Sequence, residues 1–405
     1  MATIPVITSA LDNLTKRSAR QEAPLGDQHA SVSTQCLRVL MVTPRYFPYM
    51  GGVENHVYQV ARRLTEQGVD VTVLTADPSG QLPVSEQSEG IHIQRVRAWP
   101  ANRDYYFAPD VYRLIRQGKW DIVHVQSYHT FVPLLAMLAA LRAKIPYVVT
   151  FHGGGHSSRL RNALRSTQRA LLRPLLARAE RLVAVAKFEI AMFGRELRIP
   201  RERFVLIPNG SDLPKVTQPA SRAELAGALI ASVGRLERYK GHQRIIAAMP
   251  HILRQKPDAH LWIAGVGPYE AELKHLAASL GVADRVLIRA IPAPDRETMA
   301  AELSKAALFV LLSEYETHPI SALEALALGL PVLVADTSGL SELAERGWAR
   351  AVSLDSTDQQ VAKAVLEQLD HPLVPASLEL PTWDDCAASL LALYQTIARR
   401  PSCAS

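Results

Sequence analysis

Residues 313–336, with the sequence SEYETHPISALEALALGLPVLVAD, decide the fold that we expect for this chain. The run reads as a loop, a helix with one apolar face, a glycine turn and a buried strand. Glu316 lies in the loop, and Glu324 lies about one turn into a helix that begins near Ile320. The helix N-terminus presents N–H groups and a partial positive charge, which favour phosphate, while carboxylates accept hydrogen bonds from hydroxyls. Phosphate and hydroxyls together indicate a nucleotide sugar.

The composition is that of a soluble globular protein. The chain has 405 residues, of which 48% are hydrophobic and 21% are charged, and this length suits two or three domains with substantial cores. It contains no apolar run near the ~20 residues that span a bilayer. Its start lacks the pattern of a secretory signal, and its three cysteines, without metal-ligand spacing, predict free thiols. We therefore expect a cytoplasmic protein.

The first half of the chain predicts a parallel sheet with helices between its strands. An apolar strand over 38–43 precedes Gly51 and Gly52, and a helix and a second strand over 69–75 follow. Glycines at the first turn let a ligand approach the backbone closely. The alternative is a tight turn without a ligand, because the third glycine of the dinucleotide fingerprint is missing.

His152 directly follows an apolar strand over 147–151. In doubly wound sheets, ligands bind beyond the carboxyl ends of the strands, so this position is suited to a ligand contact. A structural histidine at the end of a strand is the alternative.

A basic segment covers residues 157–181. Four arginines recur every four residues on one side of a predicted helix, which Pro174 should interrupt, and these are Arg161, Arg165, Arg169 and Arg173. The net charge of +6 likewise favours anionic partners. The segment is either a solvated helix face over a core or a docking surface for an anionic membrane. Because no zinc-finger or RNA-binding signature accompanies the charge, we do not expect nucleic acid as a partner.

The second half of the chain repeats the alternation of strands and helices. A strand over 228–233 leads to Arg235 and Lys240, which can converge on one diphosphate because arginine offers a fork and lysine a compact charge. A later strand runs into Gly265 and Gly267, a turn where the backbone could approach a nucleotide. No Asp-x-Asp motif occurs in the sequence, so we expect no bound metal and no cofactor beyond the nucleotide sugar.

Together, these motifs resemble the family 4 retaining glycosyltransferases, also described as group 1 glycosyltransferases. Glu324 follows Glu316 by eight positions, and Gly329, Pro331 and an apolar strand come after it, as in that family. The resemblance implies an α/β chain of the GT-B fold, with two Rossmann-like doubly wound domains facing across a cleft. It also implies that the last helix, over 384–399, crosses back to the first domain.

We place the domain boundaries from the same resemblance. Residues 1–36 are predicted to be a flexible extension, 37–212 the acceptor domain and 213–382 the donor domain, and 383–405 the helix that returns to the acceptor domain. A polar spacer over 214–219 should join the two domains.

One departure from the family lies in the loop after the first acid. Many members have an aromatic residue and a glycine there, whereas this chain has Thr317, His318 and Pro319. Proline has no N–H, so the predicted phosphate contacts fall on Ile320 and Ser321. A second departure, Ala290 in place of a glycine that contacts the base in relatives, leaves the base undefined.

The resemblance also assigns roles to the residues. Arg235 and Lys240 would bind the donor diphosphate, Glu316 the sugar hydroxyls, Glu324 the ribose, and His152 would orient the sugar. The predicted activity is transfer of a hexose, from a UDP- or GDP-linked donor, to a lipid-linked or polysaccharide-precursor acceptor, in the cytoplasm or at the inner face of the membrane. The alternatives are a GT-B epimerase or phosphorylase and a non-catalytic sugar-binding protein of the same fold.

Overall fold

The computed structural model describes residues 36–49, 51–100, 107–153, 159–211, 228–292 and 295–398, and of residues 159–166 it describes the backbone alone. The predicted extension therefore lies outside the described residues except for Cys36, and so do the predicted spacer over 214–219 and the boundary between 212 and 213. The domain boundaries consequently stay predictions.

The first sheet is built from residues 38–206 and is almost wholly parallel. Its strand order is β3-β4-β2-β1-β5-β6-β7-β8, and among these strands the β3–β4 pair alone is antiparallel. Strand β1 lies in the interior, with β2 on one side and β5 on the other. The strands are β1 (Arg38–Thr43), β2 (Asp70–Asp77), β3 (Ser85–Ser88), β4 (Ile91–Arg97), β5 (Ile122–Gln126), β6 (Tyr147–Thr150), β7 (Arg181–Ala184) and β8 (Phe204–Leu206).

Helices cover both faces of the first sheet, so each face carries its own apolar core. One core includes residues of α2, α3, α4 and α5, and the other includes residues of α1 and α12. These helices are α1 (Gly52–Glu66), α2 (Asp110–Gln117), α3 (Phe131–Ala143), α4 (Arg159–Leu176), α5 (Lys187–Leu197) and α12 (Trp383–Ala398).

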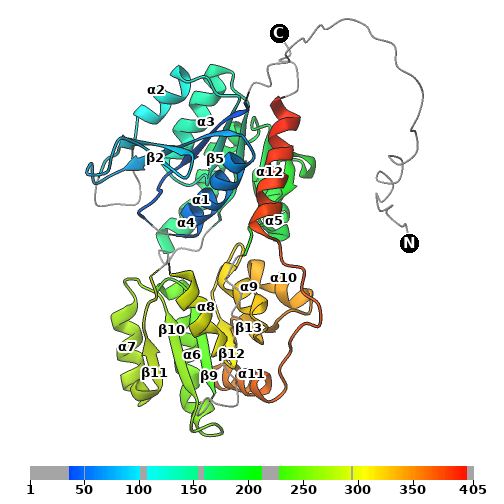
Figure 1. The fold of residues 1–405 in the computed structure, drawn as a ribbon. Helices are drawn as coiled ribbons and strands as arrows, with labels where there is room; N and C mark the ends of the chain where they lie inside the picture. Colours follow the sequence, from blue (N-terminus) through cyan, green and yellow to red (C-terminus); the bar gives the residue numbers. More distant parts are fainter. Residues whose placement is uncertain are drawn as a thin grey trace, which may run out of the picture. The chain divides into compact units, whose positions relative to one another are not determined.

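The last helix joins the first sheet although it comes from the end of the chain. Helix α12, drawn in red in Figure 1, packs against α1 through Trp383, Leu390 and Tyr394, which lie in one core with residues of β1 and β2. Arg63 of α1 reaches Asp384 of α12 with a distance of 2.6 Å between Nε and Oδ1. The predicted return of the C-terminal helix is thus confirmed.

The second sheet is parallel throughout the described residues, in the order β11-β10-β9-β12-β13-β14. Its strands are β9 (Leu229–Val233), β10 (His260–Ala264), β11 (Val286–Ile288), β12 (Leu308–Leu311), β13 (Val332–Ala335) and β14 (Arg350–Val352). Its helices are α6 (His242–Leu253), α7 (Glu270–Ser279), α8 (Arg296–Ser304), α9 (Ile320–Ala327), α10 (Ser338–Glu345) and α11 (Asp358–Asp370). The apolar residues of this part form one buried cluster.

Two sheets of this kind, each with helices beside it, confirm the predicted α/β class with two Rossmann-like units. The strand over 38–43 has the predicted bounds. Strand β3 was not predicted, because its four residues, SEQS, are polar and show no alternation. The prediction that Pro174 interrupts the basic helix is wrong, since α4 continues to Leu176. So close to a helix end, the missing N–H and the ring affect only the last turn.

We predict that the packing of α12 supports the stability of the first sheet. Leu390 is fully buried, and Leu390→Ala should lower the free energy of unfolding by about 2–5 kcal/mol because it leaves a cavity. Urea denaturation followed by tryptophan fluorescence measures the change. Leu171 has 75% of its surface exposed, so Leu171→Ala is the matched control and should stay within about 0.5 kcal/mol. Equal effects of the two substitutions would contradict the assigned packing.

Candidate active site

The candidate site lies beyond the carboxyl end of β9. This strand lies between β10 and β12, so the strands that follow it in the sequence are placed first on one side of it and then on the other. The strand order thus reverses at β9, and ligands bind at such switch points. After Gly234 the chain makes a short 3₁₀ turn over Arg238–Lys240, and α6 follows. Gly241 joins the turn to α6 with a φ of +77°, and a Cβ there would lie 1.9 Å from the Leu312 carbonyl oxygen. Only glycine suits this position.

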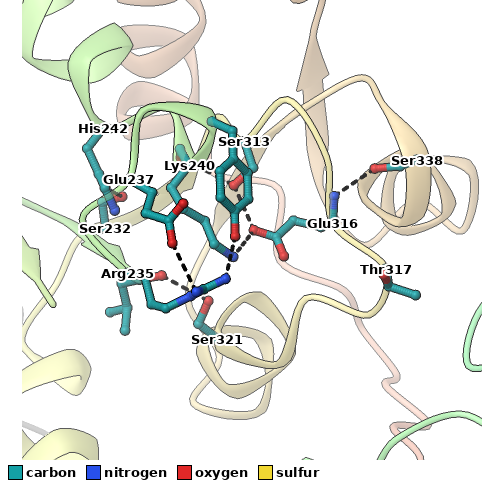
Figure 2. Close-up of polar contacts among 12 residues, drawn as sticks. Ser232, Arg235, Glu237, Lys240, His242, Ser313, Glu316, Thr317, Ser321 and Ser338 are labelled. Carbon is teal, nitrogen blue, oxygen red and sulfur yellow. Dashed lines mark hydrogen bonds and ion pairs between the residues drawn. The ribbon is translucent and has the colours of Figure 1, made fainter. Parts of the chain in front are cut away.

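Lys240 and Glu316 form an ion pair in this site (Figure 2). The distance between Lys240 Nζ and Glu316 Oε1 is 2.6 Å, and the side chains are 16% and 12% exposed. The Ser313 hydroxyl donates to the same carboxylate oxygen at 2.7 Å, and the Glu316 N–H donates to Ser338 Oγ at 2.9 Å. The two predicted residues are therefore brought together from positions 76 apart in the sequence.

Arg235 lies between the end of β9 and this turn, and 60% of its side chain is exposed. Its Nη1 lies 2.9 Å from Glu237 Oε1, and its Nη2 donates to the Tyr239 hydroxyl at 2.7 Å. Burial raises the pKa of the Tyr239 phenol, so this group is neutral at physiological pH. Sequence reasoning did not single out Tyr239, because an aromatic residue between two basic ones carries no signal of its own.

Gly265 and Gly267 have a structural role that the sequence did not reveal. A Cβ at Gly265 would lie 1.9 Å from the Gly234 carbonyl oxygen, and one at Gly267 would lie 2.3 Å from the Leu236 carbonyl oxygen. The loop after β10 thus lies against the loop that carries Arg235, and it needs glycine for that close approach. Contact of these glycines with a nucleotide stays a prediction.

Glu324 lies on α9 and is buried, with 5% of its surface exposed. Its Oε1 is in contact with Nη2 of Arg296, the first residue of α8. Sequence reasoning missed Arg296, because the spacing of 28 residues corresponds to no local pattern. The predicted ribose contact of Glu324 would therefore be made beside a guanidinium.

The N-terminus of α9 carries the two residues that are predicted to contact phosphate. The Ile320 N–H donates to the His318 carbonyl at 2.9 Å, and its contact with phosphate stays a prediction. The Ser321 hydroxyl donates to the carbonyl of Val233 at the end of β9, at 3.1 Å. That bond holds the start of α9 beside the loop that carries Arg235.

His152 lies after β6 in the first sheet and is buried, with 8% of its surface exposed. Its Nε2 lies 2.8 Å from Oε1 of Gln126, and its ring meets the His56 ring edge-on at 4.8 Å. Burial lowers the pKa of His152 well below its usual range, so the ring is neutral. Gln126 and His56 were not predicted, because each is a single polar residue in an apolar or mixed run.

The two predicted glycines of the first turn differ from each other. Gly51 precedes α1, and a Cβ there would lie 2.5 Å from the Glu54 carboxylate, whose pKa burial raises. Gly52 is exposed, and a Cβ there would meet nothing within 4 Å. No packing reason thus requires glycine at Gly52, and its predicted ligand contact remains open to test.

The residues after β6 are linked to the loop that carries Glu316. The Thr317 hydroxyl donates to the Gly153 carbonyl oxygen, and a Cβ on Gly153 would lie 2.7 Å from the Tyr315 hydroxyl. Gly153 directly follows His152. The structure thus links the chain segment of the predicted sugar-orienting histidine to that of the predicted sugar-binding acid.

Glu189 is a buried acid that sequence reasoning missed. It lies in the first turn of α5, is fully buried, and its Oε2 accepts the Val185 N–H at 2.9 Å. A Cβ on Gly153 would lie 3.1 Å from its Oε1, and within the described residues no donor reaches that oxygen with hydrogen-bonding geometry. Burial raises the pKa of this carboxyl to about 8.

The basic segment only partly matches the predicted row of arginines. Arg169 is 14% exposed and pairs with Glu196 of α5 at 2.7 Å, so it does not form an exposed docking surface. Arg173 is exposed, and its Nε donates to the Leu197 carbonyl at 2.6 Å. The side chains of Arg161 and Arg165 lie outside the described residues.

Two Rossmann-like sheets, the first almost wholly parallel and the second parallel, have the architecture of the GT-B fold. Family models agree: "Glycosyltransferase Family 4" matches residues 50–215, and "Glycosyl transferases group 1" matches residues 217–379. The chain belongs to this family and is a nucleotide-sugar glycosyltransferase.

Similar proteins support this assignment. The chain is 30% identical to the GDP-mannose:cellobiosyl-diphosphopolyprenol alpha-mannosyltransferase of Xanthomonas campestris, over 79% of this chain and 84% of that protein. It is 30% identical to a glycogen synthase of Mycobacterium tuberculosis, over 83% of this chain and 87% of that protein.

Solved structures share the fold. A sucrose-phosphate synthase from Thermosynechococcus elongatus superposes with a TM-score of 0.69 at 21% identity, over 89% of this chain and 96% of that one. Anabaena HepE in complex with UDP and glucose superposes with a TM-score of 0.67 at 17% identity, over 90% of this chain and 97% of that one.

We predict that Glu189 weakens the fold as the pH rises. Its folded-state pKa of about 8 lies above the ordinary 4.5, so the folded state holds a proton that the unfolded state releases between these values. Stability is therefore lost as the pH rises through this window, by up to about 1.4 kcal/mol per pH unit. Glu189→Gln lacks this titration. Urea unfolding at pH 5.5, 6.5 and 7.5 should therefore show that the free energy of unfolding of the variant rises relative to that of the wild type as the pH increases. A difference independent of pH would mean that Glu189 is already ionised in the fold.

Proposed function

We propose that the protein is a retaining hexosyltransferase that takes a UDP- or GDP-linked sugar and needs no bound metal ion. The observation that carries this proposal is the convergence of Arg235, Lys240 and Glu316 at the switch point of the second sheet. Two cations and an acid at such a point suit a sugar diphosphate, because cations neutralise phosphate and a carboxylate accepts hydrogen bonds from hydroxyls.

The cations would act on the leaving group. When the bond from the sugar to the diphosphate breaks, negative charge develops on the diphosphate and positive charge on the sugar ring. Arg235 and Lys240 would stabilise the diphosphate through charge-assisted hydrogen bonds, each contributing about 1.5–3 kcal/mol. These interactions strengthen as the bond breaks, so they accelerate the reaction.

Donor binding would also rearrange the ion pair. In the structure, Lys240 is paired with Glu316 at 2.6 Å. A diphosphate oxygen that takes Lys240 would release the Glu316 carboxylate, which could then accept hydrogen bonds from the sugar hydroxyls. Binding of the donor diphosphate would thereby make the Glu316 carboxylate available to the donor sugar.

The remaining roles follow from the family resemblance. His152 would orient the sugar as a neutral ring, and Glu324, beside Arg296, would bind the ribose. The acceptor hydroxyl would attack from the face that the diphosphate leaves, which preserves the anomeric configuration. A donor phosphate oxygen would take the hydroxyl proton, so no protein base is assigned.

For the acceptor, we propose a lipid-linked saccharide or a polysaccharide precursor. The mannosyltransferase of Xanthomonas campestris, whose acceptor is a diphosphopolyprenol, supports this choice. No helix in the described part of the chain is long and apolar enough to cross a bilayer. Cytoplasmic location and attachment to the membrane through the basic segment stay predictions.

Two alternatives remain distinguishable by experiment. A non-catalytic sugar-binding protein would bind the donor but would show none of the slow donor hydrolysis expected of a transferase. The presence of all four charged donor-site residues argues against this alternative, and these are Arg235, Lys240, Glu316 and Glu324. A GT-B epimerase would change the donor sugar without an acceptor, and a phosphorylase would consume free phosphate.

We predict that Lys240→Ala lowers the rate of donor turnover about 10²–10³-fold, because the charge on the leaving diphosphate loses a fixed cation. Release of the nucleoside diphosphate measures this rate. Lys274 is 61% exposed and pairs with Glu270 on α7, so Lys274→Ala serves as the control and should keep full activity. Unchanged turnover in Lys240→Ala would reject the assignment of the site.

The donor class can be identified by ligand-induced stabilisation. We predict that UDP or GDP, but not both equally, raises the melting temperature, and that magnesium does not change the shift. At about 100 times the dissociation constant, a ligand that binds only the folded state adds about 2.7 kcal/mol. A shift that requires magnesium would contradict the metal-independent mechanism.

A further inference from the structure

Tyr239 lies between the two predicted diphosphate-binding cations and touches both. Its hydroxyl accepts a hydrogen bond from Arg235 Nη2 at 2.7 Å, and Lys240 Nζ lies 5.4 Å from the centroid of its ring. The residue is buried, with 5% of its surface exposed. No predicted contact with the donor involves Tyr239 itself.

The backbone of Tyr239 is fixed as firmly as its side chain. Its carbonyl accepts the Glu314 N–H at 2.7 Å, which ties the 3₁₀ turn to the loop that carries Glu316. The Ser313 hydroxyl lies 3.2 Å from the carbonyl oxygen of Lys240, next along the turn. The phenol therefore belongs to a rigid part of the site.

The cations differ in how much support they need. Lys240 is 16% exposed and held by Glu316, whereas Arg235 is 60% exposed. A long exposed side chain loses conformational entropy when it binds a ligand, and a preset orientation reduces that loss. The Tyr239 hydroxyl and the Glu237 carboxylate hold the two terminal nitrogens of Arg235.

The two partners of Arg235 are not equivalent. The Glu237 carboxylate neutralises the guanidinium and would compete with a diphosphate for it. The phenol carries no charge at physiological pH, because burial raises its pKa, so it orients Arg235 without competing electrostatically. The phenol can thus keep its bond while a diphosphate replaces the carboxylate.

We propose that Tyr239 is a positioning residue that holds Arg235 and Lys240 at the spacing that binds the donor diphosphate. The hydroxyl sets the guanidinium through a hydrogen bond, and the ring lies against the ammonium as a weak cation–π partner. This inference rests on the proposed function, in which both cations bind the diphosphate.

The test is a double-mutant cycle with Tyr239→Phe and Arg235→Ala, read by calorimetric titration with UDP and with GDP. Tyr239→Phe keeps the ring and removes the hydroxyl, and it should weaken binding of the preferred nucleotide about 3- to 10-fold. In the Arg235→Ala background the same substitution should have no further effect, because its action passes through Arg235. Additive losses would overturn the inference, since a merely structural hydroxyl weakens binding in either background.

Two comparisons separate the possible failures. Tyr147→Phe removes another phenol hydroxyl, one that donates to the Leu175 carbonyl at 2.6 Å in the first sheet, and it should leave nucleotide binding unchanged. If Arg235→Ala weakens binding and Tyr239→Phe does not, this inference is wrong and the proposed function stands. If Arg235→Ala leaves binding unchanged, the proposed function fails and the inference fails with it. Melting curves of each variant confirm that it is folded.

Discussion

The ion pair between Lys240 and Glu316 is the interaction on which the rest of the site depends. Both side chains are more than four-fifths buried, since they are 16% and 12% exposed. Removing a charge from water costs several kcal/mol unless a partner compensates it. Pairing the two residues compensates this cost, and in the proposed function a diphosphate would replace the carboxylate as the counter-charge of Lys240. The pair thus keeps both groups in place.

Backbone geometry makes this pairing possible. Gly241 lets the turn that carries Lys240 lie against Leu312 at the end of β12, and Ser338 at the start of α10 accepts the Glu316 N–H. Gly265 and Gly267 perform a similar task for the loop that carries Arg235. Each position allows a close backbone approach, so the glycines of this site first serve packing, and ligand contact is an additional hypothesis.

The buried acids around the site are stabilised in different ways. Glu316 has a lysine and a serine, and Glu324 has the guanidinium of Arg296. Glu189 has backbone donors, and burial raises its pKa to about 8. The same residue type is therefore held by cations at two positions and by backbone N–H groups at the third, because its neighbours differ.

Much of the fold and part of the site follow from the sequence alone. Local periodicity predicts the strand over 38–43, and the run from Glu316 to Glu324, with the glycine turn and strand after it, carries the family resemblance that implies the GT-B fold. These features are local, so neighbouring residues are enough to define them. The tertiary structure alone decided the pairing of Lys240 with Glu316 and of Arg296 with Glu324. Such contacts depend on how separate strands and loops pack and not on the residues beside them in the chain.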